Sequence, residues 1–438
     1  MGSYIVNTKE EQLSMLHDIG KESLDELFAD VPAEVRIGAL DLPRGLSEME
    51  TAERMKDIAA KNRVFRHIFR GAGSYNHYIP AVVKSVTSKE EFVTAYTPYQ
   101  PEISQGILQS IFEYQTIICE LTGMEAANAS LYDGGTAAAE GALMCTDRRR
   151  GKILVSAAAN PGALSVVRTY AYGRNTEVIE VPAKDGVTDL EQLAQLLDGQ
   201  TACFYVQQPN YFGNIEDIDR IVGLVHDAGA KLVMGCNPIS LAVLKTPGEY
   251  GADIAVGEGQ PLGMPMGFGG PYLGFMAVSK KLIHKMPGRI IGKTEDKEGR
   301  TAYVLTLQAR EQHIRREKAG SNICSNEALC ALTAGVYVSA MGPAGLREAA
   351  NQCVAKAHYL ADVLKAAGLT VENKGPFFHE FVTCAQVPAK KILARLEADG
   401  ILGGLPLDEH RILWCCTEKN SKAEIDRVGE LVKEVVRA

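Results

Sequence analysis

The stretch GADIAVGEGQPLGMPMGFGGPYLGFMA, residues 251–277, carries two short apolar runs on either side of a glycine-rich segment. Residues 254–256 and 273–278 are almost continuously apolar, which is typical of strands that are covered on both faces. The segment between them contains no lysine, and none occurs between Thr246 and Ser279. The stretch therefore predicts two buried strands joined by a loop that lacks a primary amine.

Four more runs of the same kind precede this stretch and alternate with helical patterns. They are residues 152–156, 177–181, 203–207 and 231–234. Nearly continuous apolar strands that alternate with helices predict an α/β fold, an open sandwich with a mainly parallel sheet. Ligands of such sheets bind in the crevice at the carboxyl ends of the strands, so we expect any site to lie there.

The ends of the chain have different patterns. Residues 1–65 are predicted to form an N-terminal helical arm, in which Ser47 and Glu50 form a capping box. Its expected helices cover residues 10–19, 23–28 and 47–62. The large α/β domain is expected over 66–325, and a helix over 326–341 should stop at Gly342-Pro343.

A small C-terminal α+β domain is predicted over 326–438. Strands are expected over residues 379–384 and 411–416. The last helix should start at a capping box of Ser421 and Glu424 and bury one apolar face.

Composition limits the classes of function. The formal charge is -8 and the pI is about 5.7, which argues against a nucleic-acid partner. The ten cysteines form no CxxC pair, so they suggest a reducing, cytoplasmic setting and no metal site. We find no targeting segment and no apolar run of spanning length, so no membrane contact is expected.

Two segments carry candidate chemistry. Pro98 and Pro101 keep TAYTPYQPE, residues 94–102, out of a helix, so its hydroxyls, amide and carboxylate are presented together. It could line a polar pocket or be a surface loop anchored by its tyrosines. The pair Gly134-Gly135 opens a helix whose free amides could hold a phosphate, but Asp133 serves there as an ordinary N-cap, which we favour.

Residues 251–277 resemble the segment that carries the cofactor lysine in pyridoxal-phosphate enzymes. That cofactor is held as an imine on a lysine amine, which the amide of Gln260 cannot form. The strand over 231–237 would supply an aspartate for the pyridine nitrogen, yet its end offers no acid. Two groups that the cofactor requires, the amine and the acid, are thus missing, which suggests that this pocket no longer binds it.

The whole chain resembles the glycine dehydrogenase (decarboxylating) family, the P-protein of the glycine cleavage system, in its alpha-subunit form. The motifs that carry the resemblance are TAYTPYQPEISQG (94–106), QTIICELTGM (115–124), SLYDGGTAAAEGALM (130–144), QQPNYFGNIED (207–217) and the stretch 251–277. They keep the order and approximate spacing of the family.

The resemblance implies a fold of the pyridoxal-phosphate-dependent transferase type, like aspartate aminotransferase. It implies a homologous beta subunit that carries the cofactor, in a heterotetramer of two alpha and two beta chains. The family reaction decarboxylates glycine and passes the aminomethyl group to the lipoyl arm of the H-protein. No cofactor is expected here: Gln260 stands at the lysine position, and the loop Gly134, Gly135 and Thr136 is vestigial.

The resemblance also gives a hypothesis for the segment of residues 71–106, which contains the polar strip TAYTPYQPE. Polar residues of this segment would help to shape the glycine and lipoyl site of the beta subunit across the interface. The candidates are His77, Tyr96, Thr97, Tyr99, Gln100 and Glu102. Two alternatives remain open: a structural or regulatory pseudoenzyme subunit, and a self-sufficient lyase that uses Lys245 or Lys280.

Overall fold

The computed structural model describes residues 6–437 apart from 39, 95–97, 268, 322 and 324–326, and at residue 310 it describes the backbone alone. The chain divides into two compact units, Met1–Val64 and Phe65–Ala438. The boundary expected after residue 325 falls among residues that are not described, and the division of the second unit into two domains stays a prediction.

The first unit is a set of short helices with little core. They are α1 (Lys9–Asp18), the 3-10 helices η1 (Leu24–Phe28) and η2 (Ala33–Val35), and α2 (Glu48–Ala59). The predicted capping box of Ser47 and Glu50 is present. The predicted helix over 23–28 is a 3-10 turn instead. Within the described part of this unit, Leu16 is the only buried residue.

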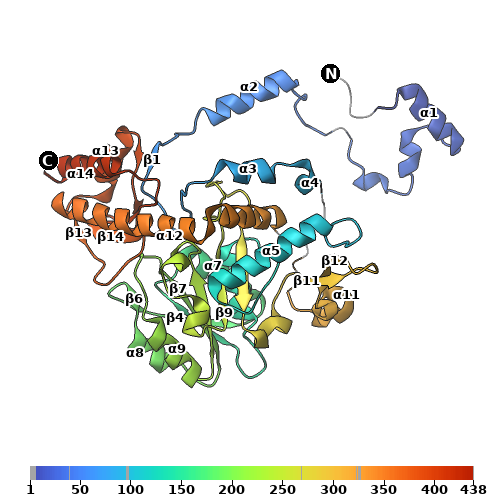
Figure 1. Cartoon of the computed structure of the whole chain (residues 1–438). Helices are drawn as coiled ribbons and strands as arrows, with labels where there is room; N and C mark the ends of the chain where they lie inside the picture. Colours follow the sequence, from blue (N-terminus) through green and yellow to red (C-terminus); the bar gives the residue numbers. More distant parts are fainter. Residues whose placement is uncertain are drawn as a thin grey trace. The chain divides into compact units, whose positions relative to one another are not determined.

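The second unit is built on a seven-stranded sheet (Figure 1). In sheet order the strands are β2 (Ala126–Ala127), β10 (Gly274–Val278), β9 (Ile254–Glu258), β8 (Lys231–Cys236), β7 (Thr201–Gln208), β3 (Lys152–Ser156) and β4 (Glu177–Val181). The run from β9 to β4 is parallel, while β10 is antiparallel to both β9 and β2. The predicted strands and the mainly parallel sheet are therefore confirmed.

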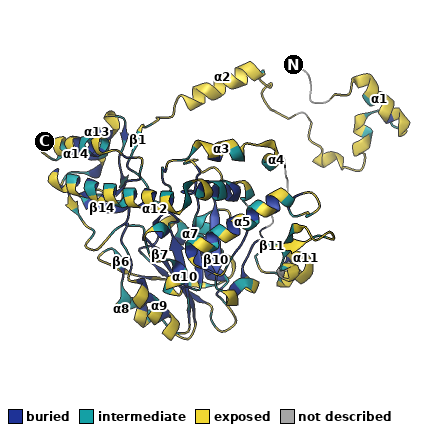
Figure 2. Ribbon diagram, in the orientation of Figure 1, coloured by how far each residue is buried: buried dark blue, intermediate teal, exposed yellow. Residues whose placement is uncertain are grey.

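Helices cover both faces of this sheet. They are α5 (Gln105–Thr122), α6 (Gly134–Leu143), α7 (Pro161–Gly173), α8 (Leu190–Leu196) and α9 (Ile218–Asp227). Alternate residues of β3 show why the strands are apolar throughout. Ile153 and Val155 pack in the core with α6 and α7, whereas Leu154 packs in the core with α8 and α9. Figure 2 shows the strands dark blue beneath helices with exposed outer faces.

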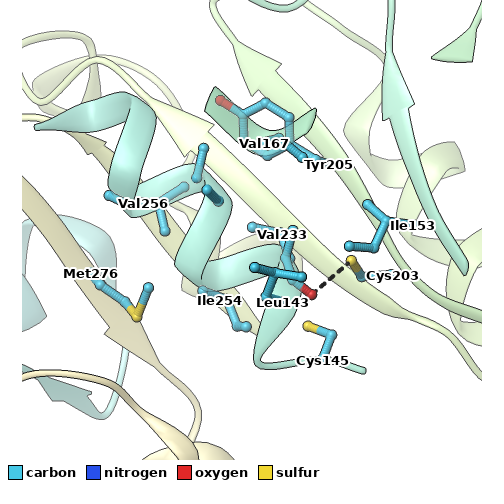
Figure 3. Close-up of a cluster of buried hydrophobic side chains, with 14 of the residues drawn as sticks. Leu143, Cys145, Ile153, Val167, Cys203, Tyr205, Val233, Ile254, Val256 and Met276 are labelled. Atoms are coloured by element: carbon cyan, nitrogen blue, oxygen red, sulfur yellow. Dashed lines mark hydrogen bonds between the residues drawn. The ribbon is translucent and has the colours of Figure 1, made fainter. Parts of the chain in front are cut away.

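The core beneath α6 is shown in Figure 3. Leu143 at the end of α6 packs there with Val233 of β8 and Val256 of β9. The Cys203 thiol donates a hydrogen bond to the carbonyl of Ala142 (3.5 Å). This thiol is a small core side chain, as its apolar surroundings predict.

A smaller four-stranded antiparallel sheet lies in the C-terminal part, with helices packed on it. Its strands, in order, are β13 (Thr370–Val371), β14 (Glu380–Cys384), β17 (Arg411–Cys415) and β16 (Leu405–Pro406). The helices are α13 (Ala389–Ala398) and α14 (Lys422–Arg437), and the Ser421 and Glu424 capping box is present. Near the start of the second unit, β1 (His67–Ile68) pairs with β15 (Ile401–Leu402).

The remaining elements connect these layers. They are α3 (Ala81–Thr87), α4 (Glu90–Val93), β5 (Ala183–Lys184), β6 (Val187–Thr188), η3 (Ser240–Ala242), α10 (Pro247–Tyr250), η4 (Lys280–Lys285), β11 (Ile290–Glu295), β12 (Thr301–Thr306), η5 (Gln308–Arg310), α11 (Gln312–Arg315) and η6 (Arg316–Lys318). The hairpin of β11 and β12 was not predicted.

The element α12 (Ala328–Ala366) consists of two helices that meet at a kink. The first helix ends at Gly342-Pro343, as predicted, and a second helix that was not predicted follows it. Gly342 has φ 62° and ψ 176°, a conformation that breaks the helix locally. Pro343 then begins the second half, where a missing N–H costs nothing. Glycine and proline therefore end the first helix, and the kink joins it to the second.

By length and composition α12 is also apolar enough to cross a membrane. The prediction that no segment reaches that length is therefore wrong. Core helices pass the same test, and α12 contributes to two cores of the described chain. Tyr337 packs with α5 and the sheet, and Leu360 packs against the small sheet. The expected absence of membrane contact stays a prediction.

Candidate functional site

A cavity of about 370 Å³ lies where the parallel strands end, as the fold predicts. Strands β7, β8 and β9 end at it, and helices α6 and α7 begin at it. Its lining residues are Gly73, Tyr75, Asp133, Gly134, Gly135, Asn160, Gly162, Ala163, Val166, Tyr205, Gln207, Gly235, Cys236, Asn237, Gly257 and Glu258. Within this lining the acidic side chains are Asp133 and Glu258, and no described lining residue is basic.

Gln260 does not line this cavity, although it follows β9 by two residues. Its side chain is fully buried and binds the backbone of Tyr75 at both ends. Its Oε1 accepts from the N–H of Tyr75 (2.9 Å), and its Nε2 donates to the carbonyls of Tyr75 (2.9 Å) and Met264 (2.7 Å). The amide therefore fastens the segment around Tyr75 to the loop after β9.

Two carboxylates stand at the start of α6. Asp133 caps the helix by accepting from the N–H of Thr136 (2.7 Å), so the N-cap that we favoured is present. Glu258 accepts from the N–H of Gly134 (2.9 Å). Burial raises the pKa of Glu258 to about 7, against the lowering effect of its backbone hydrogen bonds.

These residues do not fit pyridoxal phosphate. Gln260, the residue expected at the lysine position, has a buried amide that binds Tyr75 and Met264. Strand β8 ends at Cys236 and is followed by Asn237, so its end offers no acid. A phosphate at Gly134 and Thr136 would meet two carboxylates in place of the usual free amides. The described lining adds no cation to offset that repulsion.

The lysines of the self-sufficient alternative lie outside the cavity lining. Lys245 forms an ion pair with Asp219 (2.7 Å) and is largely exposed. Lys280 starts the 3-10 helix η4 and is exposed. Neither side chain therefore supplies an amine to this cavity.

The segment of residues 70–78 forms one wall of the cavity and is held by buried acids. Glu380 of β14 accepts from the N–H of Ala72 (2.6 Å) and from the hydroxyl of Tyr75 (2.7 Å). Burial raises the pKa of Glu380 to about 7, although both hydrogen bonds lower it. The Nδ1–H of His77 donates to Glu418 Oε2 (2.8 Å).

The ligand atoms of His77, Cys353 and Glu418 lie within 4.8 Å of one another. These are types of residue that can bind a metal ion. The carboxylate of Glu418 already accepts from His77, and it receives the Cys353 thiol at 3.6 Å. The three groups therefore form a hydrogen-bonded cluster, in which the buried Nε2 of His77 has no hydrogen-bond partner among the described residues. The expected absence of a metal stays a prediction.

The predicted site residues are scattered over different environments. His77 is 4% exposed, and Tyr99 is half-buried, with the Arg289 guanidinium 5.0 Å from its ring centre. Gln100 and Glu102 are exposed. Of the candidates that the structure describes, none lines the cavity, and Tyr96 and Thr97 lie outside the described residues. Their role at a partner chain stays a prediction.

Sequence reasoning missed several residues of the cavity. Glu258 was overlooked, although its place at the end of β9, two residues before Gln260, points it toward the start of α6. Tyr205 and Asn160 were also missed. Asn160 could have been found, since an Asn directly before Pro161 is a typical N-cap and a helix start after β3 must face the crevice.

The comparisons with known proteins agree over nearly the whole chain. The family model described as glycine cleavage system P-protein matches residues 2–432. The probable glycine dehydrogenase (decarboxylating) subunit 1 of Moorella thermoacetica is 52% identical, over 99% of this chain and 100% of that protein.

Solved structures give the same picture. A crystal structure of glycine decarboxylase (P-protein) of the glycine cleavage system, in inhibitor-bound form, has a TM-score of 0.93 and 42% identity, covering 99% of this chain and 100% of that chain. The alanine–glyoxylate aminotransferase of Nostoc sp. has a TM-score of 0.60 at 17% identity, covering 92% and 98%. The second likeness shows the fold alone, which is the expected aminotransferase type.

Proposed function

This chain belongs to the glycine cleavage system P-protein family, and from that premise we propose that it is the alpha subunit of a glycine dehydrogenase (decarboxylating). We assign the cofactor to another chain because of the contacts that Gln260 makes. Its amide is buried and bound to the backbone of Tyr75, so the chain offers no amine at the cofactor position. The cofactor lysine of the enzyme then belongs to a beta subunit.

In the proposed enzyme, glycine is decarboxylated with pyridoxal phosphate held by the beta subunit. The aminomethyl group passes to the lipoyl arm of the H-protein. The subunit number in the names of the relatives supports a partner chain. We propose two alpha and two beta chains, working in the cytoplasm.

The alpha chain would contribute shape and polar groups to the partner's site. The proposed contributors are His77, Tyr96, Thr97, Tyr99, Gln100 and Glu102. Among those that the structure describes, Tyr99, Gln100 and Glu102 reach the surface at least in part. His77 is buried by its own chain, so it would act by holding the 70–78 segment in place. Neutral hydrogen bonds from such groups are worth about 0.5–1.5 kcal/mol each.

Co-purification with a beta subunit, followed by glycine–carbon dioxide exchange, tests this function. The complex should catalyse exchange, and the lone alpha chain mixed with pyridoxal phosphate should show neither exchange nor imine absorbance. Imine absorbance of the lone chain would favour the self-sufficient lyase. Exchange by the beta subunit alone at the full rate would favour a structural or regulatory subunit.

The proposed contribution of the strip is tested at Tyr99. Tyr99→Phe removes one hydroxyl and should slow exchange about tenfold while the complex stays assembled on gel filtration. Glu295→Gln, an exposed change on β11, is the control and should leave the rate unchanged. A wild-type rate in Tyr99→Phe would remove this residue from the site.

A further inference from the structure

Three backbone N–H groups from three different segments point at one side chain, Glu258. Gly134 at the start of α6 donates to its Oε2 (2.9 Å). Gln260 and Leu273, before and after the glycine-rich loop, donate to its Oε1 (2.9 and 3.1 Å). Converging backbone donors with a helix N-terminus are how proteins bind oxyanions. The donors are therefore arranged as an anion site, and a carboxylate of the same chain fills it.

A further unused donor faces the same cavity. Tyr205 lines it and is 3% exposed, and its hydroxyl has no hydrogen-bond partner among the described residues. In Figure 3 the hydroxyl lies at the end of the ring that points away from Cys203. A Cβ at Gly235 would stand 2.7 Å from this oxygen, so the glycine leaves room for it. If Glu258 only capped α6, the cavity wall would need no further hydrogen-bond donor. The Tyr205 hydroxyl is such a donor.

Gly134, at the start of α6, also supports the interpretation that Glu258 fills an anion site. A Cβ at Gly134 would lie 2.9 Å from the Cβ of Glu258 and 3.0 Å from its N atom. Only glycine therefore lets the backbone of α6 approach β9 closely enough for the hydrogen bond. The close approach allows the hydrogen bond to the Glu258 carboxylate, and Asp133 separately accepts from the N–H of Thr136.

We propose that Gly134, Gln260 and Leu273 form an anion site that is occupied by the chain's own Glu258 carboxylate, which keeps small oxyanions and phosphate esters out of the cavity. The ligand class of the vacated site would be carboxylates and inorganic phosphate. A lysine restored at position 260 would not rebuild a cofactor site, because the phosphate would still meet Glu258. This goes beyond the proposed function and does not depend on it.

Chemical rescue of Glu258→Ala in the full-length chain tests the proposal. The variant should unfold at a lower temperature than the wild type, because three backbone donors lose their acceptor. Sodium acetate or sodium phosphate, compared with sodium chloride at equal ionic strength, should restore at least half of the lost thermal midpoint. The wild type should gain no more from acetate than from chloride. A Glu258→Ala midpoint that responds equally to the three salts would overturn the proposal.

A control variant and a refolding experiment keep the test decisive. Glu216→Ala removes another buried carboxylate that accepts from a backbone N–H, that of Thr188, but it lies outside the cavity lining. Equal rescue of this control by acetate would mean a general salt effect and would overturn the proposal. If Glu258→Ala does not fold in sodium chloride, it should fold when it is refolded in sodium acetate or sodium phosphate, because the anion replaces the lost acceptor of the three backbone donors. Failure of the variant to fold in all three salts would also overturn the proposal.

Discussion

Glu380→Gln is the change whose effect on stability can be worked out most fully. The carboxyl group is buried and accepts from the Ala72 N–H and the Tyr75 hydroxyl, and its pKa is raised from 4.5 to about 7. Glutamine can keep both contacts, because its oxygen accepts from Ala72 and its amide N–H donates to the Tyr75 oxygen. The main change is therefore the loss of titration.

The sign of the effect follows from the raised pKa. An acid that is harder to ionise in the folded state stabilises the fold below about pH 4.5, and this stability is lost as the pH rises through about 7. The difference between the two pKa values corresponds to about 3 kcal/mol. Between about pH 5 and about pH 8, the wild type should thus lose about 2.5 kcal/mol relative to Glu380→Gln.

The single tryptophan suits the measurement. Trp414 is fully buried, and in β17 it pairs with Phe381, the neighbour of Glu380 in β14. Urea unfolding followed by its fluorescence at both pH values gives the difference between the two proteins. The exposed Glu295→Gln should track the wild type at both. If Glu380→Gln loses as much stability with rising pH as the wild type does, Glu380 is not the group with the raised pKa.

Two more predictions concern buried polar groups. Tyr114→Phe should leave stability within about 0.5 kcal/mol or raise it, because the buried hydroxyl has no hydrogen-bond partner among the described residues; a loss of about 2 kcal/mol in urea unfolding would reveal a hidden partner. Gln260→Ala should cost about 2–4 kcal/mol, because it leaves the buried N–H of Tyr75 without its acceptor. Thermal unfolding checks this second change, and an unaltered midpoint would contradict the paired contact.

The fold was predictable because its apolar pattern is simple. The β3 segment has both faces buried, and its short, near-continuous apolar run is typical of a covered strand. The second half of α12 was not predictable, since the Gly342-Pro343 pair looks the same whether a loop or a second helix follows it. Which one forms depends on whether the following residues find a core, and Leu360 finds it against the small sheet, far away in sequence.

The sequence predicted the place of the site, the Asp133 N-cap and the missing cofactor groups, but not the contacts that build the cavity. The missing amine at Gln260 and the missing acid on β8 could be seen because chemistry requires them at fixed places. The contacts that build the site join residues that are far apart in the sequence: Gly134 with Glu258, and Glu380 with Tyr75. No local pattern shows such pairs. The strip around Tyr99 stood out by composition, yet none of its described residues lines the cavity at the ends of the parallel strands.

Gln260 and its neighbour Glu258 both have hydrogen-bond partners within the chain, and this determines what their mutation should do. Gln260 holds the backbone of Tyr75, and Glu258 holds three amides around the glycine-rich loop. An empty pocket would tolerate changes at both positions, because no hydrogen bonds between its walls would depend on these side chains. Here both side chains connect cavity walls. Their loss should therefore lower the stability of the alpha chain first and alter the rate of the complex only through that loss.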